Sequence, residues 1–201
     1  MNKPSKNLIE AGAVMLVIVI VFGYGFFYPR MHPERNVTRF LNAMTSFNSS
    51  RVAKNYAGSY EDFDFMTPLL AYEKAGDNSE ETPSEKEQQQ NKDFSSMLYD
   101  FTYELGERSI SGKTATVEAT VHAYPIGETY LESKGDRAAL LDLKQGEKSY
   151  TTTTTFSLIM KDGYWYVDTL TDDNKDALSG GLYHTLAELN AESETTSQEA
   201  T

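Results

Sequence analysis

The 201-residue sequence contains no cysteine, which excludes a disulfide framework, a thiolate nucleophile, a cysteine metal site and a lipid-modified cysteine anchor. Its three histidines, His32, His122 and His184, are scattered and do not have the spacing of a zinc site. Neither a Gly-x-Ser-x-Gly motif nor a phosphate-binding glycine loop is present. We therefore expect no catalytic residues, no metal and no cofactor.

Basic residues are also scarce, because 18 Lys and Arg stand against 30 Asp and Glu, for a formal net charge of -12. A surface that acidic repels phosphate backbones and anionic lipid headgroups. No local basic patch is visible in the order of residues. We therefore expect no nucleic-acid partner.

One long apolar run interrupts this polar composition, since residues 11–28 read AGAVMLVIVIVFGYGFFY without a charge. With Leu8 and Ile9 the run reaches about 20 residues, or roughly 30 Å as a helix, which matches the hydrocarbon core of a bilayer. Aromatic residues crowd its end, as is typical of a membrane interface, and Pro29 and Pro33 stop the helix. The pattern predicts a transmembrane anchor at 8–28 in contact with lipid, preceded by a cytoplasmic tail at 1–7.

A cleaved signal peptide is the competing interpretation, with Lys3 and Lys6 as its basic end. The run is longer than a usual signal sequence, and bulky aromatics stand where small residues precede a cut. For orientation, Lys3 and Lys6 are nearly balanced by Arg30, Arg35 and Arg39 across the span. A long domain crosses largely regardless of charge, so we expect a single-pass cell-membrane protein with its domain on the extracytoplasmic side.

Helical periodicity follows the apolar run. Five apolar residues recur at spacings of three and four: Val37, Phe40, Leu41, Met44 and Phe47. Asn48 breaks this pattern and can cap a second, shorter helix, and a third apolar cluster follows Ser59. Residues 75–93 are polar and cannot bury surface, so they predict a loop.

Alternation with period two then predicts strands at 101–105 and 114–124, with a turn at 111–113 between them. Five threonines at 151–155 belong to a third strand, because threonine is β-branched and favours extended backbone. A turn at 161–163 leads into the aromatic strand 164–170. Residues 137–143 predict a short helix, and apolar spacing in 172–189 predicts helix interrupted at Gly180-Gly181. The polar residues 190–201 predict a disordered tail.

Helices followed by four antiparallel strands predict an α+β domain at 33–189, with helices packed on a curved sheet of about four strands. The stretches YDFTYELGERSISGKTATVEATV and DGYWYV resemble nuclear-transport-factor-2-like domains, in particular small membrane-anchored ones of Gram-positive bacteria. The resemblance covers roughly residues 33–182. It implies a cone-shaped sheet curved around an N-terminal helix.

Some members of that fold are enzymes that use an aspartate or histidine inside the cone with a tyrosine donor. His122 alternates out of phase with the Ala/Val face of its strand, so we expect it on the solvated face, and Asp168 ends a strand. We expect Trp165 in the core. The possible ligand or partner surface consists of aromatic strand residues: Tyr164, Tyr166, Tyr103 and Tyr124.

These observations together favour a non-enzymatic, membrane-tethered extracytoplasmic domain that binds an envelope protein, a peptide or a small ligand, or forms a homo-oligomer. The resemblance leaves open a structural subunit of a conjugation or secretion apparatus, in which single-span proteins with such domains occur. A cone-pocket enzyme is the third alternative.

Overall fold

The computed structural model describes residues 29–59, 61–63, 93 and 96–199. The chain starts with a 3-10 helix and two α-helices: η1 (Pro29–Met31), α2 (Glu34–Thr45) and α3 (Ser49–Asn55). The sheet region comprises β1 (Thr102–Ser111), β2 (Thr114–Ala123), α6 (Ile126–Ser133), α7 (Arg137–Asp142), η3 (Leu143–Gln145), β3 (Tyr150–Lys161) and β4 (Tyr164–Val167). Two helices close the chain: α8 (Asp172–Leu178) and α9 (Leu182–Glu199).

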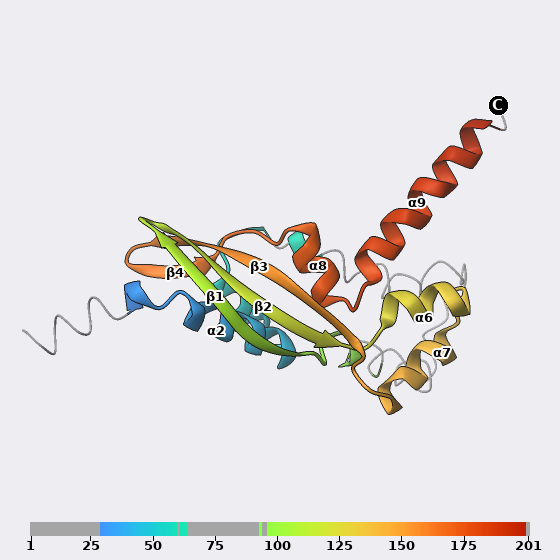
Figure 1. The fold of residues 1–201 in the computed structure, drawn as a ribbon, viewed down its shortest axis with the longest axis horizontal. Helices are drawn as coiled ribbons and strands as arrows, with labels where there is room; N and C mark the ends of the chain where they lie inside the picture. The colour runs from blue at the N-terminus through green and yellow to red at the C-terminus, as the bar shows by residue number, and fades with distance from the viewer. Residues whose placement is uncertain (1–28, 60, 64–92, 94–95, 200–201) are drawn as a thin grey trace, which may run out of the picture.

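The four strands form one antiparallel, curved sheet in the order β1-β2-β3-β4, which confirms the predicted α+β class (Figure 1). The threonine run is part of β3, where Thr152 pairs with Val121 and Thr154 with Ala119 of β2. Thr154 is buried, whereas Thr153 is exposed, so the run alternates between the two faces of the sheet.

Two tight turns lie at one end of the sheet, beside η1. Gly112 and Lys113 connect β1 to β2, and Asp162 and Gly163 connect β3 to β4. Asp162 (φ 52°) and Gly163 (φ 84°) both have positive φ, as the two-residue turn that matches strand twist requires. Residues of both turns share a hollow with Arg30. The helices α6, α7 and α9 lie at the opposite end of the molecule (Figure 1).

One face of the sheet carries the core. Phe40 of α2 meets Phe156 of β3 edge to face, with ring centroids 6.3 Å apart, and both rings are fully buried. Asn174 of α8 covers the same face, because its Nδ2 donates to Thr154 Oγ1 at 2.7 Å. The core side of the strands contributes Ala115, Val117, Ala119, Val121, Leu158, Trp165 and Val167, as the period-two pattern predicts.

The other face of the sheet is polar. Thr120 and Thr153 approach each other across β2 and β3, with Oγ1 atoms 2.9 Å apart. His122 lies on this face with Nδ1 3.0 Å from Thr151 Oγ1, which confirms the face predicted for it. Cross-strand pairs of this kind stabilise a sheet without a covering helix.

Helix α6 is an element that the sequence analysis did not predict. It packs against the turn between α8 and α9, where Gly127 N–H donates to Gly180 O at 3.0 Å. A Cβ atom at Gly127 would lie 2.4 Å from Gly181 O, so only glycine permits this approach. The two glycines that make this contact lie far apart in the sequence. The spacing of apolar residues within a short window therefore does not predict it.

The C-terminal segment differs from its prediction, since α9 continues to Glu199 across most of the expected disordered tail at 190–201. The helix starts at fully buried Leu182 and then projects away from the body (Figure 1). Its packed first turn supplies the nucleus that an isolated helix lacks, and each further residue adds one hydrogen bond. The alanines and glutamates of the segment are good helix formers.

The predicted anchor at 8–28, the cytoplasmic tail at 1–7 and most of residues 60–93 lie outside the described residues. The latter range contains the third apolar cluster and nearly all of the expected polar loop at 75–93. Across the ranges that the structure describes, no helix has both the length and the apolar character needed to cross a bilayer.

Trp165 supplies the first test, because its ring is 4% exposed and its Nε1–H donates to Arg30 O at 3.0 Å. We expect Trp165→Ala to lower the free energy of unfolding by about 3–5 kcal/mol, since truncating a buried aromatic leaves a cavity. Denaturant unfolding of the full chain in micelles, followed by circular dichroism, measures this. His122→Ala is the control and should change the free energy of unfolding little. A Trp165→Ala midpoint equal to that of the wild type would place the ring outside the core.

Candidate functional site

A cleft of about 200 Å³ opens between α2, α3 and β4. Its lining residues come from all three elements and from the segment before α2: His32, Arg35, Asn36, Arg39, Lys54, Asn55, Tyr164, Trp165 and Tyr166. The strand provides aromatic side chains and the helices provide polar and charged ones. The cleft therefore combines cations with rings at one place.

The cleft is a local concentration of positive charge on an acidic protein. Arg35 and Arg39 are four residues apart on α2 and so share one helix face, and Lys54 faces them from α3. Among the described residues that line the cleft, none is acidic. The order of residues did not reveal this patch, because it is assembled from two helices. The net charge of -12 averages over the chain and does not report how charge is distributed.

Asn36 holds the three walls of the cleft together. Its Nδ2 donates to Asn55 Oδ1 at 3.0 Å, and Val167 N–H of β4 donates to its Oδ1 at 3.2 Å. Asn55 in turn donates through Nδ2 to Arg51 O at 2.7 Å. Asn36 is 7% exposed, and its bond with Val167 N–H is buried away from water. The floor of the cleft is fixed before any ligand binds.

Backbone pairing adds a second connection between α3 and β4. Ala57 N–H donates to Val167 O at 2.7 Å, and Tyr56 forms an isolated parallel bridge with Val167. The Tyr56 hydroxyl donates to the Asp62 carboxylate and accepts from Leu170 N–H at 3.2 Å. Burial, followed by the hydrogen bond to Asp62, raises the pKa of Tyr56. This hydroxyl therefore stays protonated and serves as a structural tie.

An ion network fixes the start of α2 beside the cleft. Glu34 Oε1 lies 2.6 Å from His32 Nδ1 and also forms an ion pair with Arg108 of β1. Arg108 also lies 3.1 Å from His32 Nδ1, so the three side chains form one cluster. Burial raises the pKa of Glu34, but the hydrogen bonds from Arg108 and His32 outweigh it and hold that pKa below its usual value.

The four tyrosines expected to form a ligand surface lie in three places. Tyr164 (60% exposed) and half-buried Tyr166 both line the cleft. Tyr103 is on β1, where its hydroxyl donates to Asn42 Oδ1 at 2.8 Å and so ties the edge strand to α2. Tyr124 is buried beyond the end of β2, and its hydroxyl donates to Asp100 Oδ2 at 3.2 Å.

The cations of the cleft are the residues that the sequence analysis missed. The spacing of Arg35 and Arg39 within a predicted helix was a usable signal, because side chains at i and i+4 lie on one face. Both were counted only for membrane orientation. Lys54 gave no such signal, since its position opposite them depends on the packing of α3.

A second polar cluster lies where α8 turns into α9. Asp176 is buried and accepts from the Tyr150 hydroxyl at 2.7 Å and from His184 N–H at 2.9 Å. Burial, followed by the hydrogen bond to Asp176, raises the pKa of Tyr150. These bonds hold the turn onto the start of β3. No group of three or more His, Asp or Glu side chains within the described part of the chain is placed to hold a metal ion.

Comparisons with protein-family models, curated proteins and solved structures found no match to this chain. The likeness to nuclear-transport-factor-2-like domains therefore stays a prediction.

We expect Asn36→Ala to lower the free energy of unfolding by about 1–3 kcal/mol, because it leaves Val167 N–H buried without an acceptor. Asn42→Ala is the matched control on the same helix. Its side chain is exposed, so water replaces the lost bond to Tyr103 and the cost is smaller. Urea unfolding of both variants measures the difference, and equal midpoints would contradict the role given to Asn36.

Glu34 predicts an acid-dependent loss of stability. Since its pKa is lower in the folded state, its contribution is complete above the usual pKa of about 4.3 and disappears as pH falls through the lowered value. Melting temperatures of wild type and Glu34→Gln should thus differ most near neutral pH and converge in acid. Glu104→Gln, at an exposed site on β1, is the control and should follow the wild-type curve. A constant gap between wild type and Glu34→Gln at all pH values would contradict the prediction.

Proposed function

We propose that the chain is a non-catalytic, membrane-tethered domain on the extracytoplasmic side of the cell membrane, which binds a ligand in the cleft between α2, α3 and β4. The observation that carries this proposal is the position of the cleft. Its first lining residue, His32, follows the uncharged run 11–28 by only a few positions. A ligand in the cleft would then lie close to the membrane surface.

The junction with the apolar run supports this proposal because it is part of the folded domain. Trp165 Nε1–H donates to Arg30 O, and the ring lines the cleft. The guanidinium of Arg30 also lies against Gly163 in the β3–β4 turn. The cleft is therefore held next to residue 29 without an intervening linker.

Exposed apolar side chains at the same end of the sheet also support a location at the bilayer surface. Met31 is 59% exposed and Ile110 40% exposed, and both line the hollow beside the two turns. Arg30, Lys113 and the single acidic residue Asp162 line it as well. Apolar side chains interspersed with cations are typical of surfaces that contact lipid headgroups.

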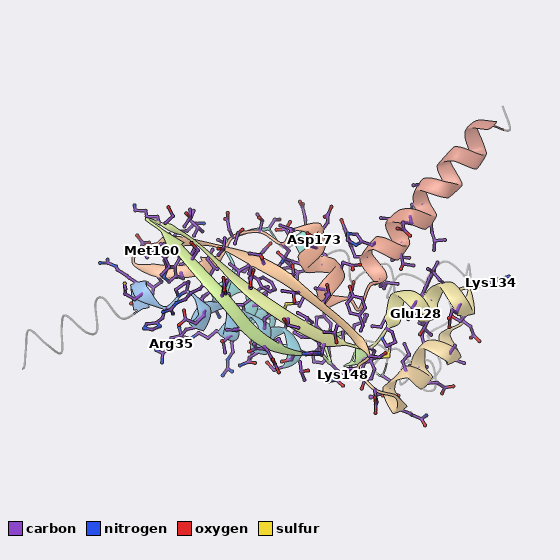
Figure 2. The ribbon with its side chains drawn as sticks, viewed as in Figure 1. Arg35, Glu128, Lys134, Lys148, Met160 and Asp173 are labelled. Atoms are coloured by element: carbon purple, nitrogen blue, oxygen red, sulfur yellow. The ribbon has the colours of Figure 1, made fainter. Side chains whose placement is uncertain are left out.

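The molecule is elongated, which separates this end from the other helices. Figure 2 shows Arg35 and Met160 near the end where the described chain begins, and Glu128 and Lys134 near the opposite end. Under the proposal, the cleft faces the headgroups, while α6, α7 and α9 extend away from the membrane.

We expect the protein to stay in the membrane fraction after high-salt and carbonate washing, because an apolar span resists both. Protease added to intact spheroplasts should remove the domain. A shortened soluble form in the medium would support signal cleavage, and a domain that survives until lysis would face inward. Copurification of a stoichiometric set of membrane proteins would favour the apparatus subunit over an independent binding domain.

A further inference from the structure

Two cations of the cleft are available to an anion. Within the described part of the chain, no ion pair involves Arg39 or Lys54, and both side chains are exposed. They approach from different helices whose separation is fixed by the Asn36–Asn55 hydrogen bond. Cations held near one another repel, so an anion that binds between them lowers the electrostatic repulsion between these two side chains.

The chemistry of these side chains suits an oxyanion such as phosphate. A guanidinium presents a planar fork of donors that matches two oxygens of one phosphate, while an ammonium contributes a compact charge. Arg39 and Lys54 supply one of each. Tyr164 and Trp165 add aromatic walls suited to the apolar part of a molecule at a membrane interface.

The size of the cleft and the charge around it limit the ligand. Its volume of about 200 Å³ is below the range of roughly 300–1,000 Å³ that holds drug-sized molecules, so it fits a single small group. A long polyanion such as a nucleic acid would also meet the remaining surface of a chain with net charge -12. A small phosphate-bearing group meets only the cleft.

From these properties we infer that the cleft binds the phosphate of an anionic phospholipid headgroup. This inference rests on the proposed function for its choice of lipid, because His32 of the cleft follows the apolar run by only a few positions in the sequence, directly after the exposed Met31. Soluble phosphate esters offer the same phosphate group. Unlike lipid headgroups, however, they would not be concentrated near the cleft by a membrane.

Trp165 makes the inference measurable, since it is the only tryptophan of the chain and it lines the cleft. The full chain in uncharged detergent micelles is titrated with short-chain phosphatidylglycerol, short-chain phosphatidylcholine and inorganic phosphate, with tryptophan emission as the readout. We expect a saturable change with phosphatidylglycerol at concentrations at least about tenfold lower than with the other two, because only this probe combines net negative charge with a lipid body.

The variant Arg39→Gln/Lys54→Gln should weaken phosphatidylglycerol binding by about 30-fold, since each cation near an anionic lipid contributes on the order of a factor of five. Lys134→Gln/Lys161→Gln removes the same charge at two exposed sites that line neither the cleft nor the hollow beside the turns, and should bind like the wild type. Arg39→Lys/Lys54→Arg keeps both charges, so its affinity for phosphatidylglycerol should stay within a few-fold of the wild-type affinity. Melting curves check that each variant is folded.

Equal weakening by the two glutamine variants would overturn the inference, because general charge rather than the cleft would then attract the lipid. Inorganic phosphate that binds as tightly as phosphatidylglycerol would overturn the choice of a lipid ligand. The titration takes place in micelles and does not require residues 8–28 to span a bilayer. Its failure is therefore distinguishable from failure of the carbonate and protease tests.

Discussion

The hydrogen bonds of the Asn36 side chain fix the relative position of α2, α3 and β4. Strand β4 is four residues long and lies at the edge of the sheet, so its outward Val167 N–H needs a partner from elsewhere. Helix α3 has seven residues, far fewer than the roughly 12–15 that an isolated helix needs to be even marginally stable. The Oδ1 atom of Asn36 accepts the hydrogen bond from this N–H group of β4. Its Nδ2 atom donates to Asn55 and so holds α3 in place. The shape of the cleft follows from that bond.

The strands could be predicted from the sequence because the features that specify them, alternation and turn residues, involve positions close together in the chain. Alternation in 114–123 and 150–160 depends on neighbours two positions apart, and Asp162-Gly163 specifies its own turn. Helix α6 and the cleft depend instead on contacts between distant segments. Gly127 against Gly181 and Lys54 near Tyr164 leave no periodic signal. Tyr103 and Tyr124 were grouped with Tyr164 because all are aromatic strand residues, yet the register of the strands separates them.

The exposed face of the sheet explains why so much threonine is present. A strand buried on one side only needs side chains on the other side that favour extended backbone and tolerate water, and threonine does both. Edge strand β1 is protected differently, since Glu104, Glu107 and Arg108 are exposed and its register shifts between Leu105 and Arg108. Charges and a bulge on an edge oppose pairing with another chain. The exposed face and the edge of the sheet therefore disfavour strand pairing between copies of the domain.

The bond between Trp165 and the carbonyl of Arg30 has a mechanical consequence. A domain on a flexible linker samples many orientations, and each binding event must select one of them at an entropic cost. Here Arg30, two positions after the apolar run, is bonded to the ring that lines the cleft, so a change of backbone conformation at residues 29–30 would break this bond. The direction in which the cleft points is therefore chosen once, during folding. The orientation of the cleft relative to residues 29–30 is thus part of the fold and is not selected when a ligand binds.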